Sequence, residues 1–125
     1  MPPSRVVVVA DDLIWAERLG RLVRAAGGDV VAVRDLDGLR SALPSAAAVV
    51  VDLTARSYDG LTAVAEARAA GRRVLAAAQH DDLELHRRAR AAGAERVVAY
   101  RLLHERGVEV IAGWLAGETS VGPRA

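Results

Sequence analysis

The chain has 125 residues, of which 52% are hydrophobic and 26% are charged, and its formal net charge is +1 at pH 7. This size and composition predict one domain with a core and argue against a general binder of nucleic acid. Cysteine is absent, which excludes disulfides and thiolate chemistry, and no apolar run reaches the ~20 residues of a membrane helix. All basic residues are arginine, so a mechanism that needs a lysine ammonium is excluded. We expect a cytoplasmic protein.

Apolar and amphipathic segments alternate along the whole chain. Strands are predicted at residues 5–10, 29–33, 46–52, 73–78 and 96–99. Helices are predicted at residues 13–26, 36–43, 61–70, 81–92 and 102–116, the last with Val108, Ile111 and Leu115 facing inward. This alternation predicts an α/β domain, a doubly wound five-stranded parallel sheet with helices on both faces. We assign residues 1–117 to that single domain and 118–125 to a flexible tail.

Acidic residues follow two of the predicted strands. Asp11 and Asp12 come directly after the first strand, and Asp52 ends the third. Ligands of open α/β sheets bind beyond the carboxyl ends of the strands, where the strand order reverses, and order 2-1-3-4-5 would bring these two ends together. Clustered carboxylates repel one another unless a cation joins them, so a hard divalent ion is the natural ligand. The alternative is that these acids only cap loops.

These acids, together with Asp59-Gly60-Leu61 and Ala92-Gly93-Ala94, resemble the receiver domain of bacterial response regulators (the CheY-like superfamily) over essentially the whole chain. The resemblance implies that Asp52 is the phosphoacceptor, whose carboxylate attacks a phosphohistidine of a sensor kinase. It also implies a magnesium site, with Mg²⁺ as the cofactor. The implied ligands are Asp12 directly, Asp11 through water, Asp52, and the backbone carbonyl of Thr54.

Three positions depart from the family pattern. Ala78 stands where the family has a threonine or serine, Tyr100 where it has a lysine, and Val97 where it has an aromatic switch residue. Hydrogen bonds to charged groups contribute about 1.5–3 kcal/mol and neutral ones about 1, so losing both phosphoryl donors should remove several kcal/mol from the phosphorylated state. We therefore expect an atypical, degenerate receiver whose usual switch is missing.

Two of the residues near the expected pocket have alternative roles. Tyr100 either packs against the core, which we favour, or donates a hydrogen bond into the pocket. Arg101 either replaces the lysine charge or, as strand alternation favours, points to the opposite face. The histidines His80, His86 and His104 show no paired metal-ligand spacing, and we expect them on the surface.

Exposed arginines predict a contact surface over the fourth helix, fifth strand and fifth helix, where a homodimer or a partner protein would bind. Ile14, beside the acids, is a second expected contact. The residues assigned to these surfaces are Ile14, His86, Arg87, Arg90 and Arg101.

The leading hypothesis is a stand-alone atypical receiver that acts through protein–protein contacts, with phosphorylation of Asp52 weak, short-lived or absent. Its partner would be a sensor histidine kinase or an output protein, with no nucleic acid and no membrane. We expect no enzyme activity beyond residual autophosphorylation and autodephosphorylation. The alternatives are a phosphoryl shuttle or sink that accepts phosphate on Asp52, and a small metal-dependent hydrolase that uses the three acids.

Overall fold

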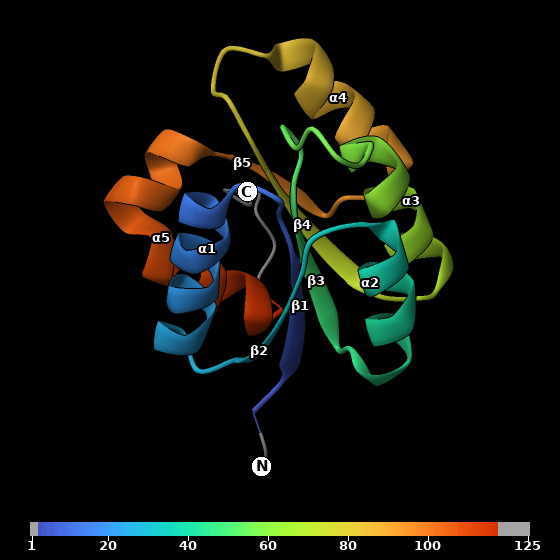
Figure 1. Ribbon diagram of the computed structural model, residues 1–125. Helices are drawn as coiled ribbons and strands as arrows, with labels where there is room; N and C mark the ends of the chain where they lie inside the picture. The colour runs from blue at the N-terminus through green and yellow to red at the C-terminus, as the bar shows by residue number, and fades with distance from the viewer. Residues whose placement is uncertain (1–2, 118–125) are drawn as a thin grey trace.

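The five predicted strands all form, and they make one parallel sheet in the predicted order β2-β1-β3-β4-β5 (Figure 1). The computed structural model describes residues 3–117. Its strands are β1 (Arg5–Val9), β2 (Asp29–Val33), β3 (Ala48–Asp52), β4 (Arg73–Ala78) and β5 (Arg96–Ala99). Its helices are α1 (Leu13–Ala25), α2 (Leu36–Ala42), α3 (Gly60–Ala69), α4 (Leu83–Ala92) and α5 (Tyr100–Leu115), with a 3₁₀ turn at Leu43–Ser45. Residues 118–125, predicted as a flexible tail, lie outside the described part.

Helices cover both faces of the sheet, as Figure 1 shows: α1 and α5 lie on one side, and α2, α3 and α4 on the other. Alternate residues of each central strand supply the two cores, because successive side chains of a strand point to opposite faces. Val8 and Val50 pack with Leu19 and Trp114 under α1 and α5. All five residues of β3 are buried, so this strand is covered on both sides. Among the described residues, no helix has the length and apolar character needed to cross a bilayer.

Aspartates begin several of the helices. The backbone N–H of Gly38 donates to Asp35 Oδ1 over 2.8 Å, so Asp35 caps α2. Asp82 caps α4 in the same way, through the N–H of Leu85 at 3.1 Å. The helix predicted at residues 81–92 begins two residues later than expected, because α4 begins at Leu83 and Asp82 is its cap.

Helix α5 differs most from its prediction. It begins at Tyr100 rather than near residue 102, and it is kinked at Arg106, where φ is −140° and ψ is 31°. The prediction that Val108 faces the core is wrong, because this side chain is 41% exposed. The buried residue here is Gly107, which faces Leu22 of α1. Val108 follows it directly, and consecutive residues of a helix are turned by ~100° from one another. The large side chains that this helix buries completely are Leu103, Ile111 and Trp114.

Gly107 permits a close approach between α5 and α1. A Cβ atom at this position would lie 2.7 Å from Cδ1 of Leu22. Such a contact is too short for two carbon atoms, so with a larger residue either the Leu22 side chain or the two helices would have to shift. The present packing of Leu22 on α5 therefore depends on a glycine at position 107.

Candidate functional site

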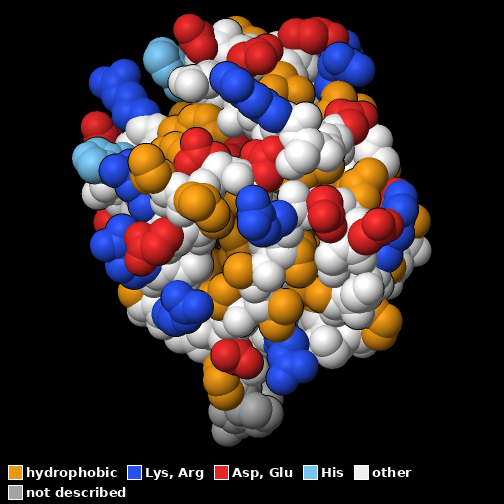
Figure 2. All heavy atoms as spheres, in the orientation of Figure 1, with side chains coloured by type: hydrophobic (Ala, Val, Ile, Leu, Met, Phe, Trp, Pro, Cys, Tyr) orange, Lys and Arg blue, Asp and Glu red, His pale blue; other side chains and the backbone are white. Residues whose placement is uncertain are grey.

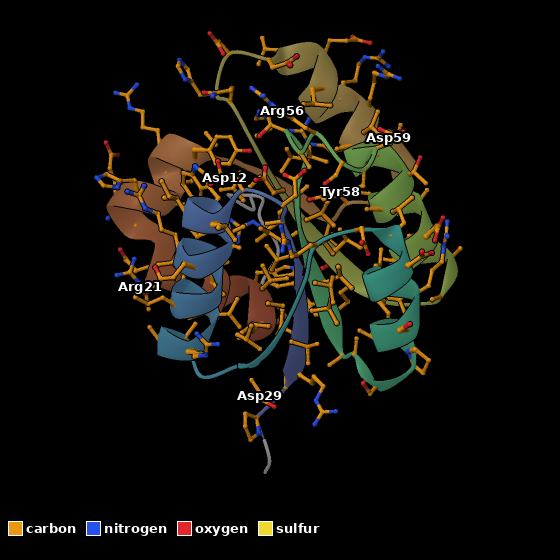
Figure 3. The ribbon with its side chains drawn as sticks, in the orientation of Figure 1. Asp12, Arg21, Asp29, Arg56, Tyr58 and Asp59 are labelled. Atoms are coloured by element: carbon orange, nitrogen blue, oxygen red, sulfur yellow. The ribbon has the colours of Figure 1, made fainter. Side chains whose placement is uncertain are left out.

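An acidic cavity lies beyond the carboxyl ends of β1 and β3. These strands are neighbours, with Val9 paired to Val51, so the residues that follow them meet at one edge of the sheet. The cavity has a volume of about 320 Å³, and the residues that line it are Asp11, Asp12, Trp15, Asp52, Thr54 and Arg56. Figure 3 shows Asp12, Arg56 and Tyr58 together at this end, and Figure 2 shows acidic side chains gathered there. The structure thus brings together the three acids that the sequence singled out.

Asp52 ends β3 and is 1% exposed. Its Oδ1 atom accepts hydrogen bonds from the backbone N–H of Thr54 at 3.1 Å and from the Thr54 hydroxyl at 3.0 Å. The same oxygen accepts a third hydrogen bond, from the hydroxyl of Tyr100. Three donors therefore stabilise one oxygen of a buried carboxylate.

Tyr100 reaches Asp52 from the first residue of α5. Its ring also packs against Trp15, with the ring centroids 4.5 Å apart and the planes at 40°. The favoured interpretation of Tyr100 as a packing residue alone is wrong, because it also donates a hydrogen bond into the cavity. Burial, and then the hydrogen bond to Asp52, raise the pKa of Tyr100. Its hydroxyl therefore keeps its proton at neutral pH and acts as a donor.

Tyr58 is a site residue that the sequence did not reveal. It lies in the loop after β3, is 8% exposed, and its hydroxyl lies 2.8 Å from the backbone carbonyls of both Val9 and Asp52. The single hydroxyl proton is shared between the ends of β1 and β3. Burial is the main cause that raises the pKa of Tyr58. The one available signal was a large aromatic residue in an otherwise polar loop.

Asp11 and Asp12 each hold a backbone segment in place. Oδ1 of Asp12 accepts the N–H groups of Ile14 at 2.9 Å and Trp15 at 3.1 Å, so it caps α1. Oδ2 of Asp11 accepts the N–H groups of Arg56 and Ser57, at 2.9 and 2.7 Å, and the Ser57 hydroxyl at 2.6 Å. The Ser57 hydroxyl is the main cause that lowers the pKa of Asp11. The capping alternative therefore describes part of what these acids do.

The structure describes no preformed metal cluster. Within residues 3–117, no three side chains of the types His, Cys, Asp and Glu are grouped closely enough to hold a metal ion. The ion pairs of the same region also leave the cavity acids out. Arg56 is the basic residue that lines the cavity.

The three departing positions lie on β4, β5 and α5. Ala78 is fully buried at the end of β4, beside Ala99 of β5. Val97 is half-buried and packs against the core under α4. Arg101 is exposed and its Nε lies 3.7 Å from the carboxylate of Glu105, so it points away from the acids. The reason is helical rather than strand geometry, because α5 has already begun at Tyr100.

One of the expected surface residues is buried. His86 is 9% exposed, and its Nε2 lies 2.8 Å from the backbone carbonyl of Gln79, so the prediction that it belongs to a partner surface is wrong. Helical spacing places it with Ala89 on the inner side of α4. Arg87 and Arg90 are exposed, as expected. Ile14 is 64% exposed beside the acidic cavity.

Solved structures similar to this chain are response regulators or receiver domains. One is a LuxR-family two-component response regulator from Aurantimonas sp. SI85-9A1, with 28% identity, a TM-score of 0.79, and coverage of 97% of this chain and 91% of that chain. Another is a CheY-like receiver domain protein from Methanospirillum hungatei JF-1, with 15% identity, a TM-score of 0.77, and coverage of 92% and 95%.

A third is a response regulator from Burkholderia pseudomallei, whose structure contains a phosphorylated aspartic acid, a calcium ion and citrate. It has 22% identity, a TM-score of 0.74, and coverage of 90% of this chain and 66% of that chain. Scans of protein-family models and of curated proteins give no match to the sequence. The strand order and these structural likenesses show that the chain has the fold of response regulator receiver domains and is similar to them, with acids at the ends of β1 and β3.

Proposed function

We propose that this receiver domain is atypical, that it acts through protein–protein contacts, and that phosphorylation of Asp52 is weak, short-lived or absent. The observation that carries the proposal is the hydrogen bond from Tyr100 to the carboxylate of Asp52. It places a neutral phenol beside the carboxylate, where the family resemblance calls for a cation.

Tyr100 disfavours phosphoryl transfer in two ways. Its hydroxyl engages an oxygen of the carboxylate that would have to attack phosphorus, and a hydrogen bond to a carboxylate lowers its nucleophilic character. Its ring, packed on Trp15, also fills space beside that carboxylate. A phosphoryl group brings additional negative charge, and catalysis of its transfer depends on positioned cations. Arg56 is the side chain of the cavity lining that could supply such a charge.

The donors of the cavity fit Mg²⁺ in chemical type, because carboxylate and carbonyl oxygens are its preferred protein ligands. We propose that Asp11, Asp12, Asp52 and the carbonyl of Thr54 would hold the ion once the three carboxylates move closer together, because among the described residues they are not grouped closely enough to hold it as they stand. When bound, it would neutralise charge on phosphoryl oxygens. Asp11 and Asp12 already accept hydrogen bonds from Ser57 and from the first turn of α1, so the ion would compete with the loop and the helix cap. We expect weak affinity.

The contact surface that we propose begins at the entrance of the cavity. Leu13 and Ile14 are 71% and 64% exposed in the first turn of α1, next to the cap residue Asp12. Adjacent exposed apolar side chains are costly in water and are typical of protein contact sites. A partner that covers them would also cover one side of the acidic cavity.

Phosphorylation by a small donor tests the proposal. The protein would be incubated with acetyl phosphate and magnesium chloride, and the phosphorylated fraction followed by intact-mass spectrometry. We expect little phosphorylated protein from the unmodified chain, several-fold more from Tyr100→Phe, and none from Asp52→Asn. The phenylalanine keeps the ring packing against Trp15 and removes only the hydroxyl.

Tyr58→Phe is the matched control, because it removes the other tyrosine hydroxyl, which binds backbone carbonyls rather than the carboxylate. This variant should lose stability without a gain in phosphorylated protein. A stable phosphorylated form in the unmodified chain, equal in yield to that of Tyr100→Phe, would contradict the proposal. Fast phosphorylation followed by fast loss would fit the short-lived form in this proposal and also the phosphoryl shuttle.

A further inference from the structure

A second cavity lies between α1 and α5, outside the acidic site. Its volume is about 460 Å³, within the range of roughly 300–1,000 Å³ that is typical of small-molecule sites. Side chains of Leu22, Leu103 and Val108 form much of its wall. Val108 is 41% exposed there, on the face of α5 that was expected to be buried.

Basic side chains border this apolar cavity. Arg18 and Arg21 come from α1, and His104 comes from α5. The guanidinium carbon of Arg18 lies 5.3 Å from the ring centroid of Trp15, which holds this cation against the cavity wall. Arg21 lies on the outer side of α1 (Figure 3), where its nearest acid is the exposed Glu17, at 3.3 Å. Figure 2 shows hydrophobic atoms bordered by blue and pale blue side chains on this side of the molecule.

Trp15 separates the two cavities. It lines the α1–α5 cavity and also the acidic cavity. Its ring packs against Tyr100, whose hydroxyl binds Asp52. A continuous set of contacts therefore runs from Arg18 through Trp15 and Tyr100 to the carboxylate.

We propose that the α1–α5 cavity binds a small amphiphilic anion, an aromatic or acyl compound that carries one carboxylate or sulfonate group. The apolar part of the ligand packs on Leu22, Leu103 and Val108. Its anionic group lies among Arg18, Arg21 and His104, because apolar walls with a few basic side chains at the rim match that chemistry. The ligand also touches Trp15, so its binding alters the contact between Tyr100 and Asp52. This last link rests on the proposed function, whereas the binding site itself does not.

The probe for the test is 8-anilinonaphthalene-1-sulfonate, which combines aromatic rings with one anionic group. Its directly excited fluorescence would be titrated against the folded, unmodified chain. We expect saturable binding of one probe molecule per chain. Val108→Trp, at an exposed position, should fill the cavity and weaken binding at least about tenfold, an expected loss of ~1.4 kcal/mol. Leu83→Trp on α4, where the native leucine is 72% exposed, should leave the affinity unchanged.

The contribution of positive charge to probe binding is tested with Arg21 and Arg87, each of which pairs with a glutamate on its own helix. Arg21→Glu should weaken probe binding several-fold, whereas Arg87→Glu on α4 should not. Equal affinity of Val108→Trp and the unmodified chain would overturn the proposal, as would equal losses for the two arginine variants. Light scattering that shows a dimer dissociated by Val108→Trp would also overturn it, since a second copy would then be the occupant.

A separate measurement tests whether a ligand in the α1–α5 cavity affects Asp52. The yield of phosphorylated protein from acetyl phosphate would be compared with and without saturating probe. We expect the yield to change at least twofold in the unmodified chain and to stay constant in Tyr100→Phe. An unchanged yield with tight probe binding would overturn the link while leaving the binding site established.

Discussion

Tyr100 and Asp52, 48 positions apart in the chain, are joined by a hydrogen bond from the phenol to the carboxylate. Tyr100 is the first residue of α5 and Asp52 the last residue of β3, so this bond connects a helix start to the end of the central strand. Trp15, which lines the cavity, packs its ring against that of Tyr100. Four predictions follow from this arrangement and from the contacts around it.

Both tyrosines of the chain should resist ionisation. Burial raises the pKa of Tyr58 and of Tyr100 above the ordinary value of 10.0. The stability that this contributes is present below about pH 10 and is lost as the pH rises further, because the unfolded chain then releases protons that the folded chain retains. Tyrosinate absorbance and far-ultraviolet circular dichroism should therefore change together in an alkaline titration. Ionisation of one tyrosine near pH 10 with native dichroism would contradict this.

Removal of the Tyr58 hydroxyl should destabilise the fold. Tyr58→Phe leaves the carbonyls of Val9 and Asp52 without their shared donor, and we expect a loss of about 1–2 kcal/mol in the free energy of unfolding. Urea denaturation measures this loss, and the slope with denaturant should stay unchanged because the fold does. A midpoint equal to that of the unmodified chain would show that water replaces the hydroxyl at no cost.

Asp11 should contribute stability that depends on its charge. Its pKa is lowered, chiefly by the Ser57 hydroxyl, so the contribution is present above the ordinary value of 3.8 and is lost as the pH falls through the lower, folded value. Asp11→Asn should therefore differ from the unmodified chain more at about pH 6 than at about pH 2 in the free energy of unfolding. Denaturant curves across this range provide the measurement. Parallel stability profiles for the two proteins would contradict the expectation.

Gly107→Ala should destabilise the packing of α5 on α1. The new methyl group would lie 2.7 Å from Cδ1 of Leu22, and overpacking of this kind costs roughly 1–3 kcal/mol. The same change in a Leu22→Ala background should be neutral or stabilising, because space is then free and alanine is favoured over glycine in helices by up to about 1 kcal/mol. A double-mutant cycle measured by urea unfolding gives this coupling. Equal costs in both backgrounds would show that the methyl group does not meet Leu22.

The sheet and the placement of the acids could be predicted because both depend on local patterns. Buried apolar runs define β1 and β3, and a parallel sheet brings their ends together. The packing of Tyr100 was predicted, but its hydrogen bond to Asp52 was the less favoured alternative, because it depends on whether residue 100 continues β5 or begins α5. A shift of that boundary turns the side chains of residues 100 and 101 in new directions, toward Asp52 for one and toward Glu105 for the other.

Contacts between distant segments account for the other differences. Val108 shared an apolar spacing with Ile111 and Leu115, which do pack against the core, but Val108 is exposed while its neighbour Gly107 approaches Leu22 of α1. His86 was predicted to belong to a basic surface because arginines flank it in the sequence. It is buried instead, where its ring contacts the backbone carbonyl of Gln79. Tyr58 gave a weak signal because its partners are carbonyl groups, which every residue carries and no sequence pattern marks.

The shared hydrogen bonds of Tyr58 have a consequence for how firmly the two sides of the acidic cavity are held. They anchor the loop that follows β3 to the last carbonyls of two adjacent strands, and Asp11 anchors the same loop again through Ser57. On another side the cavity is lined by Trp15, whose ring is held by packing against Tyr100. The loop side therefore rests on several hydrogen bonds to the backbone, whereas the Trp15 side rests on contacts between rings.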